Sequence, residues 1–282
     1  MNFEDTFSMD IDHSRIEERI EKLQERSQEL KDKELFKKIF SLIDLTSLSV
    51  SDHSEKINII VEKVNKLKSR YSDLPNVAAI CVFPVFISLV RETLKDHSVR
   101  IASVAGSFPT SQTFTEIKVL EIQRAIEEGA DEIDIVLPVG KFLSGKYDQV
   151  RSDLIKAKEA AGKNTLKVIL ETGEIKDLKL VYYASLISLE SGADFIKTST
   201  GKTETGATPE AVYIMCEAIK KFKEKTQKIA GIKPAGGISE VSTAILYYLI
   251  VNEVLGNEWL KPERFRIGAS RLANKLLGDN YF

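Results

Sequence analysis

Cysteine, histidine and tryptophan are scarce in this sequence, and their scarcity disfavours several kinds of site. The 282 residues include 2 cysteines, 3 histidines and 1 tryptophan. Cys81 and Cys216 lie far apart and outside any C-x-x-C spacing, which argues against a disulfide framework or a zinc ribbon. His13, His53 and His97 form no ligand pair such as H-x-H or H-E-x-x-H, and no G-x-S-x-G pattern occurs. A histidine-rich metal site and a serine triad are therefore both disfavoured.

The sequence also lacks an excess of one charge and a long hydrophobic run. Its 40 basic and 42 acidic side chains nearly cancel, so no strong field favours nucleic acid or an anionic membrane. No apolar run reaches about 18 residues, and no cationic segment precedes a short apolar one at the N-terminus. We therefore expect a cytoplasmic protein whose partner is a small molecule, with no nucleic acid and no membrane as partner.

The first 41 residues form a charged segment with a helical pattern. Its apolar residues are Ile16, Ile20, Leu23, Leu30, Phe36, Ile39 and Phe40. Their spacing predicts amphipathic helices. We expect an N-terminal helical arm over residues 1–41, packed on the body of the protein or on another subunit. This interpretation is favoured over a separate binding function.

From residue 42 onward, short apolar runs alternate with amphipathic stretches of helical length. The runs cover residues 42–46, 77–83, 99–106, 131–138, 166–172, 194–200, 229–235 and 264–270. Helices are predicted between them, for example over residues 114–128, 147–161, 209–224 and 240–254. Eight strands in β/α alternation predict a parallel TIM (β/α)8 barrel, in one domain over residues 42–282. A doubly wound sheet is the alternative, but it would usually carry a glycine-rich phosphate loop that is absent here.

Ionisable side chains interrupt four neighbouring strands of this predicted barrel. They are Asp134, Lys167, Lys197 and Lys233, in strands four to seven. A buried lysine is unfavourable unless it is paired or neutral, and a lysine attacks a carbonyl only as the free amine. Burial and a second cation nearby both favour that free amine. The cluster therefore predicts Schiff-base aldol chemistry, in which the carboxylate and water move protons.

Each of these residues also has a structural interpretation. Asp134 could form a core ion pair with Lys167 or Lys233 and have no catalytic duty, and Lys167 could lie half exposed near a strand start. Cys81, in the apolar run "AAICVF", is expected to act as a small buried hydrophobe.

Three glycine-containing segments follow the last three predicted strands. They are "TGK" (200–202), "AGGIS" (235–239) and "GAS" (268–270). Glycine lets a backbone approach an anion closely, and barrels commonly bind phosphate after strands seven and eight. Lys202 could add a point charge. Each of these glycine segments could instead be a plain turn. Their shared position after the last three predicted strands favours a phosphate pocket over plain turns.

The chain resembles the 2-deoxyribose-5-phosphate aldolase family, class I aldolases on a TIM barrel, from about Ile43 to Leu277. The matching strings are "GADEIDIVLP", "LKVILETGE", "GADFIKTSTGK", "ATPE", "KPAGG" and "RIGAS". The resemblance implies reversible cleavage of 2-deoxy-D-ribose 5-phosphate to D-glyceraldehyde 3-phosphate and acetaldehyde, in deoxyribose phosphate catabolism, without a metal or organic cofactor. It implies that Lys197 forms the Schiff base, that Lys233 lowers the pKa of this nucleophile, and that Asp134 is the acid/base carboxylate.

Other matched positions imply the rest of a phosphosugar site. Substrate-binding residues are expected at Asp44, Thr46, Cys81, Lys167 and Thr200. Phosphate-binding residues are expected at Gly201, Lys202, Gly236, Gly237, Gly268 and Ser270. The chain departs from many members at Ser239, where they have arginine, and at Arg271, where they have serine. Some members end in a tyrosine that reaches the site, and Tyr281 is the candidate here.

Two other functions stay open from the sequence. The chain could be another class I barrel aldolase or a transaldolase acting on a different phosphosugar, which product identity would reveal. It could also be a catalytically silent barrel that serves as a scaffold, although costly buried lysines argue against this. The assembly is expected to be a homo-oligomer, either a dimer or a tetramer.

Overall fold

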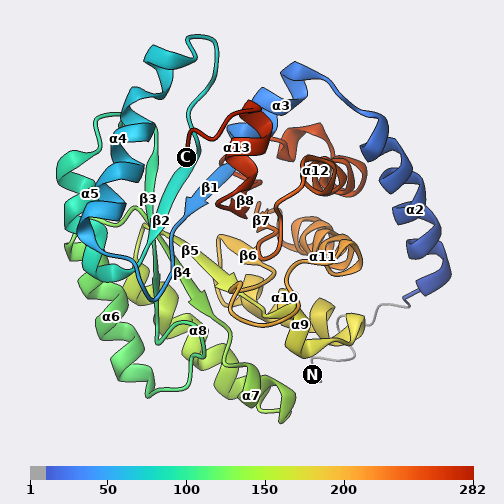
Figure 1. The fold of residues 1–282 in the computed structure, drawn as a ribbon. Coiled ribbons are helices and arrows are strands. Elements are labelled where there is room, and N and C mark those ends of the chain that lie inside the picture. Colours follow the sequence, from blue (N-terminus) through green and yellow to red (C-terminus); the bar gives the residue numbers. More distant parts are fainter. Residues whose placement is uncertain (1–10) are drawn as a thin grey trace.

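The computed structural model describes residues 11–282 of the chain. Eight strands form one parallel sheet, in the order β7-β6-β5-β4-β3-β2-β1-β8. Two isolated parallel bridges, Ile232 with Phe265 and Ala235 with Gly268, join the region of β7 to that of β8 and close the barrel. The TIM barrel predicted from the apolar runs is confirmed (Figure 1).

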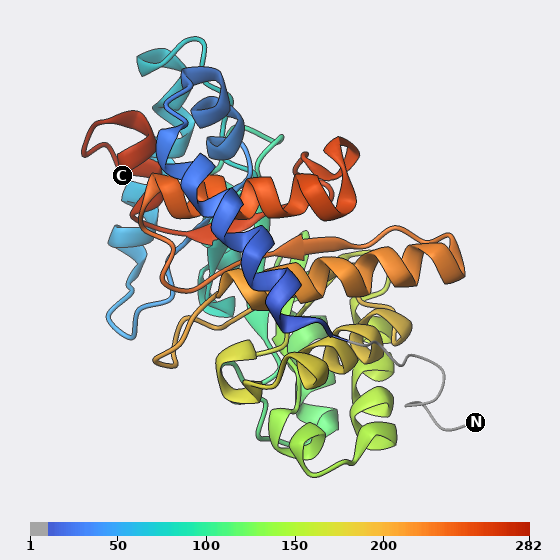
Figure 2. The ribbon, with the colours of Figure 1, turned by 90° about the vertical axis from the view of Figure 1, so that its right-hand side faces the viewer.

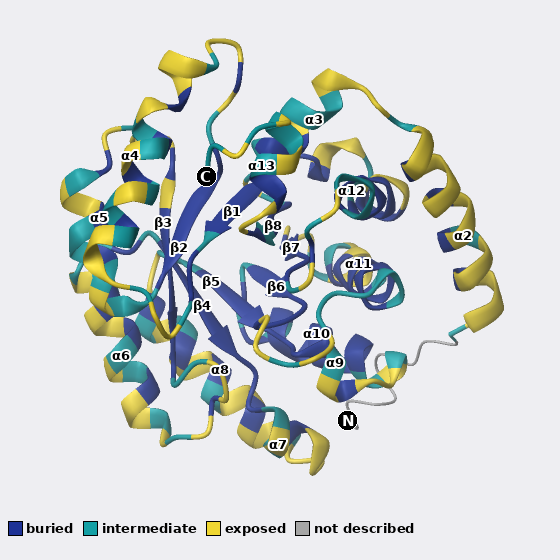
Figure 3. Ribbon diagram, in the orientation of Figure 1, coloured by how far each residue is buried: buried dark blue, intermediate teal, exposed yellow. Residues whose placement is uncertain are grey.

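The strands are short and almost entirely buried. Their bounds are β1 Ile43–Thr46, β2 Ala79–Val82, β3 Arg100–Ala105, β4 Glu132–Val136, β5 Thr165–Ile169, β6 Phe195–Lys197, β7 Gly231–Lys233 and β8 Ile267–Ala269. In a barrel, one face of each strand meets the helices and the other meets the barrel interior, so both faces are withdrawn from water. Figure 3 shows this core as a buried centre inside helices whose outer faces are exposed.

A ring of helices surrounds the barrel. Its members are α4 Ser54–Arg70, α5 Ile87–Thr93, α6 Thr115–Glu127, α8 Tyr147–Ala161, α10 Leu178–Glu190, α11 Pro209–Thr226 and α12 Val241–Leu255. Shorter helices lie in the connections or at the end: η1 Pro84–Phe86, α7 Val139–Leu143, α9 Thr172–Ile175, η2 Asn257–Trp259 and α13 Leu272–Leu277. The four helices predicted by residue range agree with α6, α8, α11 and α12 to within two residues at each end. No helix within residues 11–282 is long and apolar enough to cross a membrane.

Within the described residues, two helices precede the first strand. They are α2 His13–Glu29 and α3 Lys33–Phe40. The side chain of Asp12 accepts a hydrogen bond from the Arg15 amide at 3.1 Å and caps the start of α2.

Helix α2 lies across the outside of the barrel (Figure 2). Its buried face contains Ile16, Ile20 and Leu23, and the helix packs against α11 and α12. Helix α12 is therefore apolar on both sides, since one side covers the barrel and the other meets α2. The expected helical arm is present from residue 13. Its first 10 residues lie outside the described part of the chain. The domain boundary at residue 41 stays a prediction.

Candidate active site

Seven ionisable side chains meet inside the barrel. Each belongs to a residue that is at most 4% exposed: Asp44, Glu132, Asp134, Lys167, Lys197, Lys233 and Arg266. They come from strands β1, β4, β5, β6 and β7 and from the residue before β8. Buried charges are tolerated only when they are paired, so the contacts within this cluster decide which of its members is stable as an ion.

Asp134 is the centre of the cluster. Its Oδ2 accepts hydrogen bonds from Lys197 Nζ at 2.9 Å and from Lys233 Nζ at 2.8 Å, and its Oδ1 accepts one from Lys167 Nζ at 2.7 Å. The strand register causes this meeting, because Asp134 pairs with Lys167 across β4 and β5, and Lys197 pairs with Lys233 across β6 and β7. The core ion pairs that the sequence left as an alternative are present, and they include Lys197.

A second set of contacts lies around Arg266. Its Nη1 is 2.6 Å from Asp44 Oδ1, and its Nη2 is 2.7 Å from Glu132 Oε1. The same two carboxylates also pair with lysines, Asp44 with Lys233 at 2.5 Å and Glu132 with Lys167 at 2.6 Å. Each carboxylate therefore links the guanidinium to one of the lysines that contact the central aspartate.

Sequence reasoning missed Arg266 and Glu132. A signal existed for Glu132, which stands two residues before Asp134 and so lies on the same face of its strand. Arg266 likewise stands two residues before Gly268 in "RFRIGAS". The spacing of residues along either strand did not predict that the Arg266 and Glu132 side chains would meet, because the two residues are 134 positions apart in the chain.

The cluster contains one more cation than carboxylate. Four cationic side chains face three carboxylates when all are charged. Lys197 contacts one carboxylate, whereas Lys167, Lys233 and Arg266 each contact at least two. Lys197 is therefore the cation whose loss of a proton would balance the charges.

The pKa shifts follow the same pattern. Burial lowers the pKa of Lys197, and the Lys233 ammonium lowers it further against the opposing effect of Asp134. Burial acts on Lys233 in the same direction, but Asp134 and Asp44 outweigh it and raise the pKa of Lys233 above its ordinary value. For Asp134, burial alone would raise the pKa, and the three lysines hold it well below its usual range. Of the two neighbouring lysines, Lys197 is therefore the one that loses its proton more readily.

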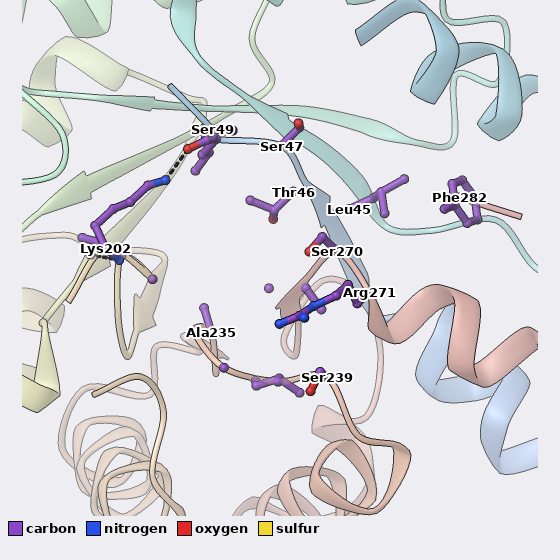
Figure 4. A pocket seen from close by; sticks show the side chains of 18 of the residues that line it. Leu45, Thr46, Ser47, Ser49, Lys202, Ala235, Ser239, Ser270, Arg271 and Phe282 are labelled. Carbon is purple, nitrogen blue, oxygen red and sulfur yellow. Dashed lines mark hydrogen bonds between the residues drawn. The ribbon is translucent and has the colours of Figure 1, made fainter. Parts of the chain in front are cut away.

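A cavity of about 520 Å³ opens above this cluster, at the carboxyl ends of the strands. Its walls come from the segments that follow β1, β6, β7 and β8 (Figure 4). Nine of the predicted site residues line it: Thr46, Lys197, Thr200, Gly201, Lys202, Gly236, Gly237, Gly268 and Ser270. The structure thus brings the predicted Schiff-base lysine and the whole predicted phosphate pocket to one cavity.

Two of the glycines are required by the backbone or by packing. Gly236 has φ +86°, a conformation that side chains disfavour. At Gly268, an added Cβ would lie 2.7 Å from Ala235 Cβ and 3.2 Å from Lys233 Cε. Gly268 therefore makes room for the Lys233 side chain as well as for the cavity.

The remaining predicted residues lie below or beside the cavity. Asp44 is fully buried in the charged cluster. Cys81 is fully buried on β2 among Leu48, Ala79, Ala102 and Val104, as expected of a small hydrophobe, and burial raises the pKa of its thiol. Lys167 is fully buried too, so the half-exposed position considered for it was wrong. Its side chain points into the barrel because the carboxylates that compensate it are there.

Glu171 organises the segment after β6. This buried carboxylate accepts hydrogen bonds from the Thr200 hydroxyl and, at 3.1 Å, from the Thr200 amide. The Thr200 hydroxyl in turn accepts one from the Lys202 amide at 3.1 Å. Sequence reasoning missed Glu171, whose φ of 58° is unusual for a residue other than glycine.

The C-terminal tyrosine is held away from the cavity. The Tyr281 hydroxyl donates to the Lys63 carbonyl at 2.8 Å, and its ring packs edge-on against Tyr71. Phe282, the next residue, lines the cavity instead. The role considered for Tyr281 therefore finds no support in this arrangement.

Within residues 11–282, no group of three or more His, Cys, Asp or Glu side chains has an arrangement that could hold a metal ion. The carboxylates of the barrel cluster are each engaged with a lysine or with Arg266.

Comparisons with known proteins give the family. Residues 38–246 match the family described as DeoC/LacD family aldolase. A curated Caenorhabditis elegans protein named "Putative deoxyribose-phosphate aldolase" is 40% identical over 278 residues, which are 98% of this chain and 91% of that protein.

Solved structures agree with this family. One, titled as the unique tetrameric structure of deoxyribose phosphate aldolase from Aeropyrum pernix, is 26% identical with a TM-score of 0.67, and covers 91% of this chain and 96% of that chain. Another, titled QR15, an aldolase, is 30% identical with a TM-score of 0.70, and covers 85% of this chain and 96% of that chain. The family match covers well over half of the chain, and the Caenorhabditis elegans relative aligns with nearly all of it. The chain therefore belongs to the DeoC/LacD family of aldolases, which are lyases.

Proposed function

We propose that this chain reversibly cleaves 2-deoxy-D-ribose 5-phosphate to D-glyceraldehyde 3-phosphate and acetaldehyde, through a Schiff base on Lys197. The observation that carries this proposal is the position of Lys197. It is the one lysine of the buried cluster that also lines the cavity, and its pKa is lowered. A free amine at the floor of a cavity is what attack on an aldehyde requires.

The first chemical step would use the amine directly. Lys197 Nζ attacks the aldehyde carbon C1 of the open-chain sugar and forms a carbinolamine, which loses water to give an iminium. Asp134 lies 2.9 Å from this nitrogen and, together with water, can accept the amine proton and return it to the leaving hydroxyl. The Lys233 ammonium, on the same carboxylate oxygen, disfavours a second buried cation and so keeps Lys197 neutral before attack.

Carbon–carbon cleavage follows from the iminium. The C3 hydroxyl loses its proton to a base, the C2–C3 bond breaks, and its electron pair moves toward the iminium nitrogen to give an enamine. D-glyceraldehyde 3-phosphate leaves at this point. The enamine carbon C2 then takes up a proton, and water hydrolyses the new iminium to acetaldehyde and free Lys197. We assign the proton transfers to Asp134 and water.

We place the phosphate at the glycine-lined side of the cavity. Gly236, Gly237, Gly201 and the Ser270 hydroxyl line that side and can approach an anion closely. Thr46 lines the cavity near its β1 wall, which fits a contact with the sugar. Asp44, Cys81 and Lys167 do not line the cavity, so we propose that they act through the buried cluster or its packing.

Thr200 is proposed as a substrate ligand with one restriction. Its hydroxyl already donates to Glu171. It therefore has a lone pair, but no proton, to offer to a substrate hydroxyl.

Borohydride trapping tests the proposal. Limiting 2-deoxyribose 5-phosphate and borohydride are added, and peptide mass mapping locates the adduct, with Lys197→Leu protein as the control for nonspecific alkylation. One adduct on the Lys197 peptide that is absent in the control is expected. A folded, phosphate-binding protein that gives no adduct would instead favour the scaffold function.

Product analysis separates the proposed substrate from its rivals. Formation of acetaldehyde and D-glyceraldehyde 3-phosphate would support deoxyribose phosphate catabolism as the role. Trapping with a different phosphosugar, and not with 2-deoxyribose 5-phosphate, would favour another class I aldolase or a transaldolase.

We also propose that the chain forms a homo-oligomer. The relative from Aeropyrum pernix is described as a tetramer. Size-exclusion chromatography with light scattering would give the mass in solution, and a monomer at micromolar concentration would contradict this proposal.

A further inference from the structure

The cationic side chains that line the cavity differ in whether they have partners. Those side chains are Lys56, Lys197, Lys202 and Arg271. Lys56 forms an ion pair with Asp52 at 2.5 Å. Lys202, expected from the sequence to hold the phosphate, donates its Nζ hydrogen bond to the Leu48 carbonyl across the cavity mouth (Figure 4).

Arg271 is the exception. In the part of the chain that the structure describes, no hydrogen bond or ion pair involves its guanidinium. The Glu240 carboxylate forms an ion pair with Lys275, and Lys275 and, to a smaller extent, Arg271 lower its pKa. Figure 4 shows the Arg271 side chain extending into the cavity between Ser270 and Ser239. It is an exposed guanidinium in a cavity whose lining also includes Gly201, Gly236, Gly237 and Gly268.

A phosphate monoester is bound more tightly when a cationic side chain joins the backbone amide donors. The glycine segments supply dipoles and close approach, but they carry no net charge. An arginine supplies a full charge and two parallel N–H donors that match two phosphate oxygens. Lys197 must stay neutral, and the other two lysines are engaged, so Arg271 is the cation best placed for the anion.

We propose that Arg271 binds the phosphate group of the substrate, and that Lys202 instead holds the Leu48 segment in place at the cavity mouth. This inference rests on the proposed function for the identity of the substrate, and it deepens that function by naming a charged ligand that the sequence did not assign. Arg271 thereby determines the preference for phosphorylated over unphosphorylated aldehydes.

The test compares two substrates in one set of full-length variants. Arg271→Met and Arg271→Lys are assayed with 2-deoxyribose 5-phosphate and with 2-deoxyribose, and inorganic phosphate is titrated as a competitive inhibitor. Arg100→Met is the matched control. Arg100 is also an exposed arginine that forms no ion pair within residues 11–282, and it lies at the opposite end of the barrel, where β3 begins.

For Arg271→Met, we expect KM for the phosphorylated sugar and the inhibition constant of phosphate to rise by about 10- to 100-fold, the range for losing a charged hydrogen-bond partner. The rate on 2-deoxyribose should stay within about twofold, because no phosphate is bound there. Arg271→Lys should lie between wild type and Arg271→Met, since lysine keeps the charge but loses the paired donors. Arg100→Met should match wild type on both substrates.

Two outcomes would overturn the inference. One is an unchanged KM and phosphate inhibition in Arg271→Met, and the other is an equal loss on both substrates. Failure of the proposed function has a different signature. Wild type would then cleave no 2-deoxyribose 5-phosphate, while calorimetric titration would still detect inorganic phosphate binding that Arg271→Met weakens, and the assignment of Arg271 would stand.

Discussion

Lys197 and Lys233 are register partners on adjacent strands, and their amino nitrogens contact the same carboxylate oxygen, Oδ2 of Asp134, at 2.9 and 2.8 Å. Two ammonium groups so close together repel each other, and a single carboxylate oxygen compensates them only in part. The ion pair of Lys233 with Asp44 breaks the symmetry, because Lys197 has no such second partner among the described contacts. One lysine is therefore held charged while the other is free to lose its proton.

Replacing Lys197 with methionine should abolish activity without unfolding the protein. The substitution removes the amine whose proton is not needed for charge balance, and three cations still face three carboxylates in the cluster. Aldol cleavage should fall by about four orders of magnitude or more, while Tm stays at or above that of wild type. Calorimetry and a coupled aldehyde assay would measure both. A variant that loses Tm along with activity would contradict the charge balance described for the cluster.

Replacing Lys233 with leucine should raise the pKa of Lys197 and shift the activity profile toward alkaline pH. With Lys233 gone, charge balance requires Lys197 to be protonated. The free amine would then be scarce at neutral pH, and the rate should fall about tenfold for each unit by which the pKa rises. Activity should recover as the pH is raised through the new pKa. The measurement is the pH dependence of inactivation by borohydride with substrate, and an unchanged profile would refute the role of Lys233.

Replacing Glu171 with glutamine should weaken substrate binding more than it slows catalysis. The Thr200 hydroxyl and amide depend on this carboxylate, and loss of its charge should loosen residues 198–203. We expect KM to rise by roughly 3- to 10-fold, for about 1 kcal/mol of lost hydrogen bonding, with kcat within about twofold. Glu174→Gln is the matched control, since Glu174 lies exposed on α9, the short helix that begins directly after Glu171. Equal effects of the two substitutions would exclude a positioning role.

Replacing Arg266 with methionine should destabilise the protein strongly. Asp44 and Glu132 each lose an ion-pair partner in a buried site, which should lower the free energy of unfolding by about 3–5 kcal/mol. Adding Glu132→Gln to Arg266→Met should restore part of that loss, because it removes one of the uncompensated charges. Urea unfolding of both single variants and the double variant would give the coupling energy. Strict additivity of the two changes would show that the pair does not act as a unit.

Much of the fold was predictable because the signals are local. The apolar runs that became β1 to β8 are bounded by polar helical segments, and both faces of such strands are buried, so each run stands out in the sequence. Lys197 and Lys233 could be singled out for the same reason, since a lysine within an apolar run is costly and conspicuous.

The sequence by itself determined the order and type of the elements, the barrel, and the presence of three lysines and a carboxylate on strands four to seven. The tertiary structure alone decided how the charges divide among them. Arg266 and Glu132 meet only after the barrel closes. Glu171 accepts hydrogen bonds from Thr200 while its own backbone is left-handed, and the Lys202 side chain donates to the Leu48 carbonyl at the cavity mouth. Electrostatic balance depends on distances between residues far apart in the chain, and spacing along one strand carries no information about them.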